Sequence, residues 1–127
     1  MAEQPFNHFS LIGDQLHEAF SQVVRAAAFN IQGGYQQGCR VDTGFQRNSA
    51  YVVTNNSSTY PGAGEKMLPM VEQPASDTEA IIAVGANYAI FNEVGTVHKP
   101  GDFAMEKAVE AERGPFQQAL KSIRIKG

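Results

Sequence analysis

Hydrophobic side chains recur at spacings of three and four along the first quarter of the chain, which is the period of one face of an α-helix. The pattern predicts one amphipathic helix over Phe6–Ile31, with Pro5 in its first turn and Gly33-Gly34 as its end. A helix of that length spans about 40 Å. It must therefore pack against a sheet or a neighbouring subunit. Its apolar face consists of Phe9, Ile12, Leu16, Ala19, Phe20, Val23, Ala27 and Ile31.

After this helix the pattern changes to short apolar runs separated by glycine-rich and polar connections. Tyr35–Gly44 is polar and predicts a loop, and Phe45–Asn55 contains a β-branched run that predicts a strand. Glu79–Val84 is the clearest strand of the chain, because it combines isoleucine, alanine and valine and is followed by a glycine.

The remaining chain predicts two helical segments. Tyr88–Val94 is long enough for one or two helical turns, and we expect Tyr88 and Phe91 to lie in the core. Asp102 can cap a final helix that begins at Phe103, and we expect Gly114-Pro115 to kink or divide it. The order of helix, strands and helix predicts an α+β fold, in which a long N-terminal helix packs on a small antiparallel sheet beside a C-terminal helix. With 127 residues, the chain is expected to form one domain over 1–127.

The segment at about 55–78 is the least hydrophobic part of the chain and is rich in Ser, Thr, Asn, Gly and Pro. A connection of this length without predicted elements indicates an extended loop that contacts a partner rather than the core. The alternative is a plain disordered surface loop. Its few large apolar side chains are adaptable ones that suit such a contact. They are Tyr60, Met67, Leu68 and Met70.

Composition and charge exclude several classes of protein. The formal net charge is −3, whereas a general binder of the phosphate backbone should carry a basic surface. The single Cys39 cannot form an internal disulfide, and the chain contains neither a signal-peptide pattern nor an apolar run long enough to span a membrane. The three histidines, His8, His17 and His98, are too far apart to predict a metal site, and we expect no cofactor.

One short motif suggests catalysis. Asp42-Thr43-Gly44 is the triplet that carries the catalytic aspartate of aspartic proteases, and small dimeric proteases of that class share one proton between two carboxylates. The polar stretch before the triplet and the long N-terminal helix argue against an all-β protease. The alternative is a structural turn, in which Asp42 and Thr43 bond nearby backbone amides and Gly44 supplies the permissive backbone angles.

Three blocks in a fixed order carry more information than any one of them. They are Val41–Ser49 (V-D-T-G-F-Q-R-N-S), Val84–Thr96 (V-G-A-N-Y-A-I-F-N-E-V-G-T) and Pro100–Ala108 (P-G-D-F-A-M-E-K-A). Together with the preceding helix, they resemble the small neck or tail-completion proteins of tailed phages. That family is typified by V-D-T-G-x-L-R-x-S, then V-G-x-x-x-x-Y-A-x-x-x-E-x-G-T, then P-x-x-F-x-x-x-A. In the second block, Glu93 is expected to accept hydrogen bonds from the tight turn at Gly95-Thr96.

The resemblance implies a structural virion protein and not an enzyme. Such a protein forms a homo-oligomeric ring, expected to be a hexamer, in the head-tail connector (neck) or at the proximal end of the tail. It surrounds the passing genomic DNA without sequence-specific binding, and it contacts an adjacent connector or head-closure ring and the tail tube or tail terminator proteins. It is made in the host cytoplasm, ends up in the virion, and needs no membrane. The alternative function is a dimeric aspartic protease that uses Asp42.

Overall fold

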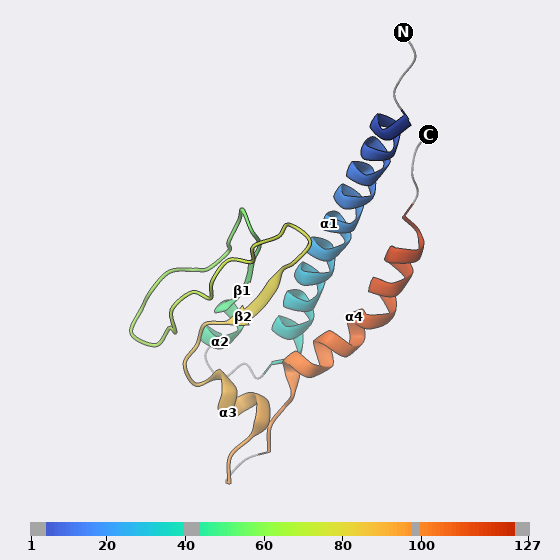
Figure 1. Ribbon diagram of the computed structural model, residues 1–127. Coiled ribbons are helices and arrows are strands. Elements are labelled where there is room, and N and C mark those ends of the chain that lie inside the picture. The colour runs from blue at the N-terminus through green and yellow to red at the C-terminus, as the bar shows by residue number, and fades with distance from the viewer. Residues whose placement is uncertain (1–4, 40–43, 98–99, 124–127) are drawn as a thin grey trace.

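The computed structural model describes residues 5–39, 44–97 and 100–123, with side chains described from residue 13 onward. Within these described residues, four helices and two strands follow one another (Figure 1). The predicted α+β architecture is confirmed: a long N-terminal helix packs on a two-stranded antiparallel sheet, and a C-terminal helix lies beside it. The elements are α1 (Pro5–Gly38), α2 (Phe45–Asn48), β1 (Ala50–Val53), β2 (Ile81–Val84), α3 (Ala89–Val94) and α4 (Ala104–Lys121).

Helix α1 continues through the two glycines that were expected to end it and stops only at Gly38. The prediction of a loop over Tyr35–Gly44 is therefore wrong for its first four residues. Glycine disfavours a helix by about 1 kcal/mol per residue, but the added turn buries Tyr35, which is only 2% exposed. At Gly34 the absence of a side chain also allows a close approach, because a Cβ there would lie 3.3 Å from the Cβ of Ala108 in α4. Tertiary packing thus outweighs the local preference.

Helix α4 packs along α1, and small residues form the contact: Ala27 and Ala28 of α1 and Ala104 and Ala108 of α4 are all buried. A polar pair reinforces it, since the Asn30 side chain donates a hydrogen bond to Glu112 Oε1 at 3.1 Å. The predicted division at Gly114-Pro115 does not occur, because α4 runs through Pro115 as one helix. Figure 1 shows this helix bending along its length, as an internal proline causes.

The two strands pair in the register Ala50–Val84, Tyr51–Ala83, Val52–Ile82 and Val53–Ile81. Because side chains alternate along a strand, the sheet has two distinct faces. Ala50 belongs to the buried cluster with Tyr35 of α1 and Ala104 of α4, so its face looks toward the helices. The strand predicted within Phe45–Asn55 begins later than expected, because a left-handed glycine, Gly44 (φ 77°), starts the short helix α2 before it.

The segment between the strands covers the opposite face of the sheet. The ring of Tyr60 packs edge-on against the ring of Tyr51 with centroids 4.9 Å apart, and Tyr60 Oη donates to the carbonyl of Leu68 at 2.8 Å. Tyr51 Oη in turn accepts a hydrogen bond from the Val71 amide at 3.1 Å. Tyr60 and Met67 of this segment are half-buried, and neither belongs to the buried core. Among the described residues, no helix is long and apolar enough to cross a membrane.

Candidate functional site

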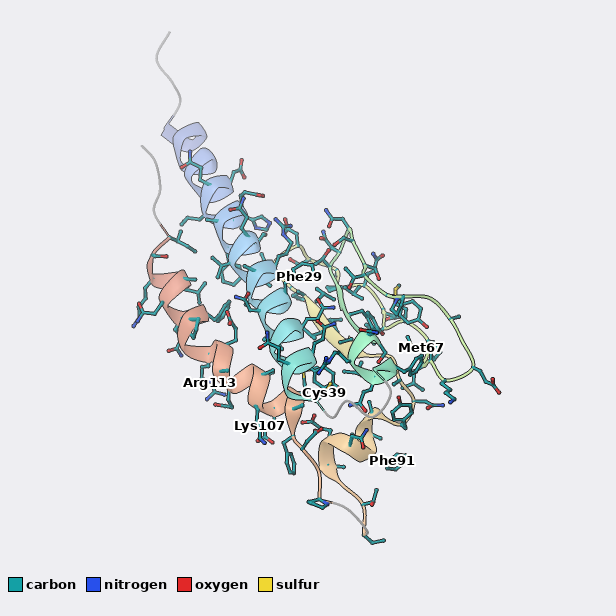
Figure 2. The ribbon with its side chains drawn as sticks, turned by 180° about the vertical axis from the view of Figure 1, so that it is seen from behind. Phe29, Cys39, Met67, Phe91, Lys107 and Arg113 are labelled. Atoms are coloured by element: carbon teal, nitrogen blue, oxygen red, sulfur yellow. The ribbon has the colours of Figure 1, made fainter. Side chains whose placement is uncertain are left out.

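The most exposed apolar side chains of the described residues gather around α3, at the end of the molecule away from the N-terminus of α1 (Figure 1). Val97 is 96% exposed, and the others are between about two-fifths and three-fifths exposed. Figure 2 shows Phe91 on the outer side of α3, pointing away from α1 and α4. We call this surface the α3 patch. It consists of Ile90, Phe91, Val94, Val97 and Phe103.

This placement corrects one prediction. Phe91 was expected in the core, but 57% of it is exposed, whereas Ala89, two residues earlier, is buried. Tyr88 is half-buried and lies against the ring of Phe45, with centroids 6.3 Å apart. A helix of six residues buries one narrow side, and in α3 the small alanine occupies that side. The large side chains therefore face outward.

A network of backbone contacts fixes the α3 patch to the body of the protein. The amides of Asp102 and Phe103 donate to the carbonyls of Asn92 and Glu93, at 2.8 and 3.0 Å. Gly101 lies so close to α3 that a Cβ there would be 2.2 Å from the carbonyl oxygen of Glu93. Phe103 has a left-handed backbone (φ 51°), which is strained for a bulky residue. The end of α3 and the start of α4 thus hold one another rigidly.

Glu93 completes this junction. Its carboxylate accepts hydrogen bonds from the amides of Met105 at 2.9 Å and Glu106 at 3.2 Å. These are two of the four N–H groups that the first turn of α4 leaves without an intrahelical partner. We expected Glu93 to accept bonds from the Gly95-Thr96 turn, and the structure assigns its carboxylate to the start of α4. A negative charge there also interacts favourably with the positive end of the helix dipole.

A buried polar chain links α1, α2 and α3 behind the α3 patch. The Gln46 side chain donates to Tyr35 Oη at 2.6 Å, and Asn92 Nδ2 donates to Gln46 Oε1. Burial, partly offset by the hydrogen bond from Gln46, raises the pKa of Tyr35 to about 12. Sequence reasoning missed this network because it placed Tyr35 in a loop. The burial of Gln46 carries no sequence signal of its own.

The four apolar residues singled out in the loop play different roles. Tyr60 packs on the sheet, and Met67 lies over Gly85, where a Cβ would approach the methionine methyl carbon to 2.2 Å. Leu68 and Met70 remain 50% and 41% exposed. Only these two are therefore available for the partner contact that the sequence predicts.

The residues of the candidate catalytic motif are only partly described. Asp42 and Thr43 lie outside the described residues, while Gly44 starts α2 with the left-handed backbone expected of a turn glycine. Within the described ranges, no group of three or more His, Cys, Asp or Glu side chains could hold a metal ion. Cys39 is buried, and His17 is engaged by the carboxylate of Asp77.

Comparison with known proteins assigns no relative: no family model matches the sequence, and no curated protein or solved structure matches the chain.

Proposed function

We propose that this chain is a structural virion protein that forms a ring in the head-tail connector of a tailed phage or at the proximal end of its tail. The observation that carries the proposal is the α3 patch. At roughly 150–250 Å² per large aromatic residue and less per isoleucine or valine, its five side chains leave on the order of 500 Å² of apolar surface exposed. That is as large as the largest patch on a typical monomer, about 300–600 Å², and patches of this size commonly serve interaction.

The rigidity of the α3 patch favours a protein partner. Glu93 and Gly101 fix it to the start of α4, so ordering it on binding requires little further loss of conformational entropy. A standard interface takes about 800 Å² from each partner, so the patch would form the apolar centre of a larger contact with a polar rim. The strained backbone of Phe103, whose side chain is 41% exposed in the patch, fits a position retained for binding.

A ring is the assembly that the three sequence blocks favour. Repeated head-to-tail contacts between identical subunits close into a ring when the rotation allows it. Each subunit would then bind two copies of itself, with six subunits expected, while adjacent connector, head-closure, tail-tube or tail-terminator proteins bind the ring above and below. Genomic DNA would pass through without sequence-specific contact. The chain would act by assembly in the virion and would catalyse no reaction.

The proposal is tested by making the α3 patch polar and following assembly. The double variant Phe91→Ser/Val97→Ser changes two exposed side chains, so each should change the stability of the fold by no more than about 0.5 kcal/mol. We expect the folded variant to be absent from purified virions and to yield unjoined heads and tails. Phe29→Ser, which alters an apolar side chain that is 46% exposed on α1, outside the α3 patch, is the control and should leave joining intact. Normal titre and normal incorporation of the double variant would refute the proposal.

A further inference from the structure

The two strands of the sheet differ in burial in a way that their pairing does not explain. All four residues of β1 are buried, whereas all four residues of β2 are only half-buried. The outer edge of β1 is covered by the chain itself, because Thr59 bonds to both the amide and the carbonyl of Val52, and Gln32 donates to the carbonyl of Ala50. Among the residues that the structure describes, none covers the outer edge of β2 in this way.

The register identifies the backbone groups left open on this edge. The Gly85 amide donates to the Ser49 carbonyl, and backbone groups alternate in direction along an antiparallel pair. Ile82 and Val84 therefore turn their N–H and C=O groups away from β1. Within residues 5–39, 44–97 and 100–123, nothing forms a hydrogen bond with these four groups.

Two hollows lie beside this edge, and both are bordered by Ile82. One, of about 280 Å³, is lined by Ile31 of α1 and by Val109 and Phe116 of α4. The other, of about 270 Å³, is lined by Tyr35, Val84 and Met105. Their walls are predominantly apolar, so each can accept one apolar side chain.

We propose that the outer edge of β2 binds an extended, uncharged peptide segment of a partner chain as an added strand, with two apolar side chains of that segment, two positions apart, in the two hollows. The N–H and C=O groups of Ile82 and Val84 that lack a partner require a polypeptide backbone as the occupant. No other common ligand offers hydrogen-bond donors and acceptors at the two-residue spacing of a strand. The run from Ala80 to Gly85 carries no charge and no proline. Charged residues and proline are two of the devices by which natural edge strands prevent pairing, and this run has neither.

Charge and local precedent favour the same occupant. The run Ala80–Gly85 carries no charge, and Glu112 and Arg113 in the lining of the first hollow carry opposite charges that offset one another, so an uncharged segment is matched to this edge. Directly beyond β2 the protein already accepts an extended segment of its own: the Leu68 amide donates to the Gly85 carbonyl, and the Asn87 amide to the Lys66 carbonyl. That pairing uses the side of Gly85 that faces β1, whereas the added strand would pair with the opposite side of β2, through Ile82 and Val84.

The inference goes beyond the proposed ring and is tested on the free protein, so that neither result depends on virion assembly. The probe is the capped, uncharged peptide Gln-Thr-Val-Thr-Leu-Thr-Gln, in which the two apolar residues lie two positions apart. At about 1 mM peptide, amide hydrogen exchange measured by NMR should slow by about tenfold or more at Ile82 and Val84. Exchange at Ala83, which already bonds to β1, should not change. The matched control peptide has the same composition with its apolar residues adjacent, and it should protect neither amide.

Two further arms show whether the contact is a β-ladder. Two peptides would be compared, one N-methylated at its odd-numbered amides and the other at its even-numbered amides. In an added strand only one of these two sets of amides faces β2, so one peptide should lose the protection and the other should keep it. Equal effects of the two peptides would overturn the proposal. Ile82→Pro removes an outward N–H that β1 does not use, so the folded variant should lose protection at Val84, while Ile82→Val should retain it. No protection by the peptide would also overturn the proposal. Protection without peptide, together with a doubled mass, would overturn it in favour of pairing between two copies of β2.

Discussion

Glu93→Ala should destabilise the protein by about 2 kcal/mol, because it removes two side-chain hydrogen bonds from the first turn of α4 and leaves the one that Asp102 accepts from the Ala104 amide. The Glu93 carboxylate accepts two backbone hydrogen bonds, from Met105 and Glu106. Loss of a cap costs typically about 1 kcal/mol and up to about 2, and the lost charge at the helix N-terminus adds about 0.3–1 kcal/mol. Glu93→Gln keeps one acceptor oxygen without the charge, so it should cost about 1 kcal/mol.

Urea and thermal unfolding followed by circular dichroism measure this effect. For a domain of this size, 1 kcal/mol corresponds to a change in Tm of about 3–5 °C, so Glu93→Ala should melt about 6–10 °C below the parent protein. The matched control is Glu110→Gln, which removes an exposed carboxylate on the same helix that lies 2.8 Å from Arg113. That change should cost at most about 0.5 kcal/mol. If Glu93→Ala has the same Tm as the control variant, Glu93 does not cap α4, and the proposed rigid junction under the α3 patch is refuted.

Three other perturbations test the packing, the buried network and the turn. In thermal melts, Gly101→Ala should unfold the junction or lower Tm by more than Glu93→Ala does, because its Cβ would meet backbone atoms. The control Gly38→Ala should be tolerated, because its Cβ meets nothing within 4 Å. The pKa of Tyr35 is about 12 in the folded protein and 10.0 in the unfolded chain. Its contribution to the free energy of unfolding should therefore be complete below pH 10 and should fall as the pH rises from 10 toward 12. In urea titrations, Tyr35→Phe should flatten that decline. Asp42→Asn should abolish no proteolytic processing step when the proteins of the particle are followed on gels. Loss of a processing step in a normally assembled particle would favour the protease alternative.

The hydrophobic pattern predicted those elements whose local and tertiary preferences agree. Glu79–Val84 was expected as a strand and contains β2, and the helical turns expected within Tyr88–Val94 contain α3. Asp102 was expected to cap the last helix, and its carboxylate accepts a hydrogen bond from the amide of Ala104, the first residue of α4, at 3.1 Å. In each segment, a β-branched run, a short periodic run or a capping residue is itself the local cause of the structure.

The failures share one physical origin, which is contact between distant segments. Gly33-Gly34 predicts a helix end, but α1 continues because Tyr35 packs in a core cluster that includes Ala104 and Ala108. Phe91 was predicted to lie in the core, but only one narrow side of α3 packs against the rest of the protein, and Ala89 occupies that side. Neither the α3 patch nor the open edge of β2 could be predicted from the sequence, because exposure depends on what the rest of the chain leaves uncovered.

The copy number of this chain in the neck of the virion tests the central claim most directly. Neck complexes released from purified phage particles would be weighed by mass photometry and imaged by electron microscopy, with the chain identified by a labelled antibody fragment. The proposed function predicts several copies per complex, with six expected, arranged as a closed ring around the channel. A single copy per neck, or absence of the chain from the particle, would contradict it.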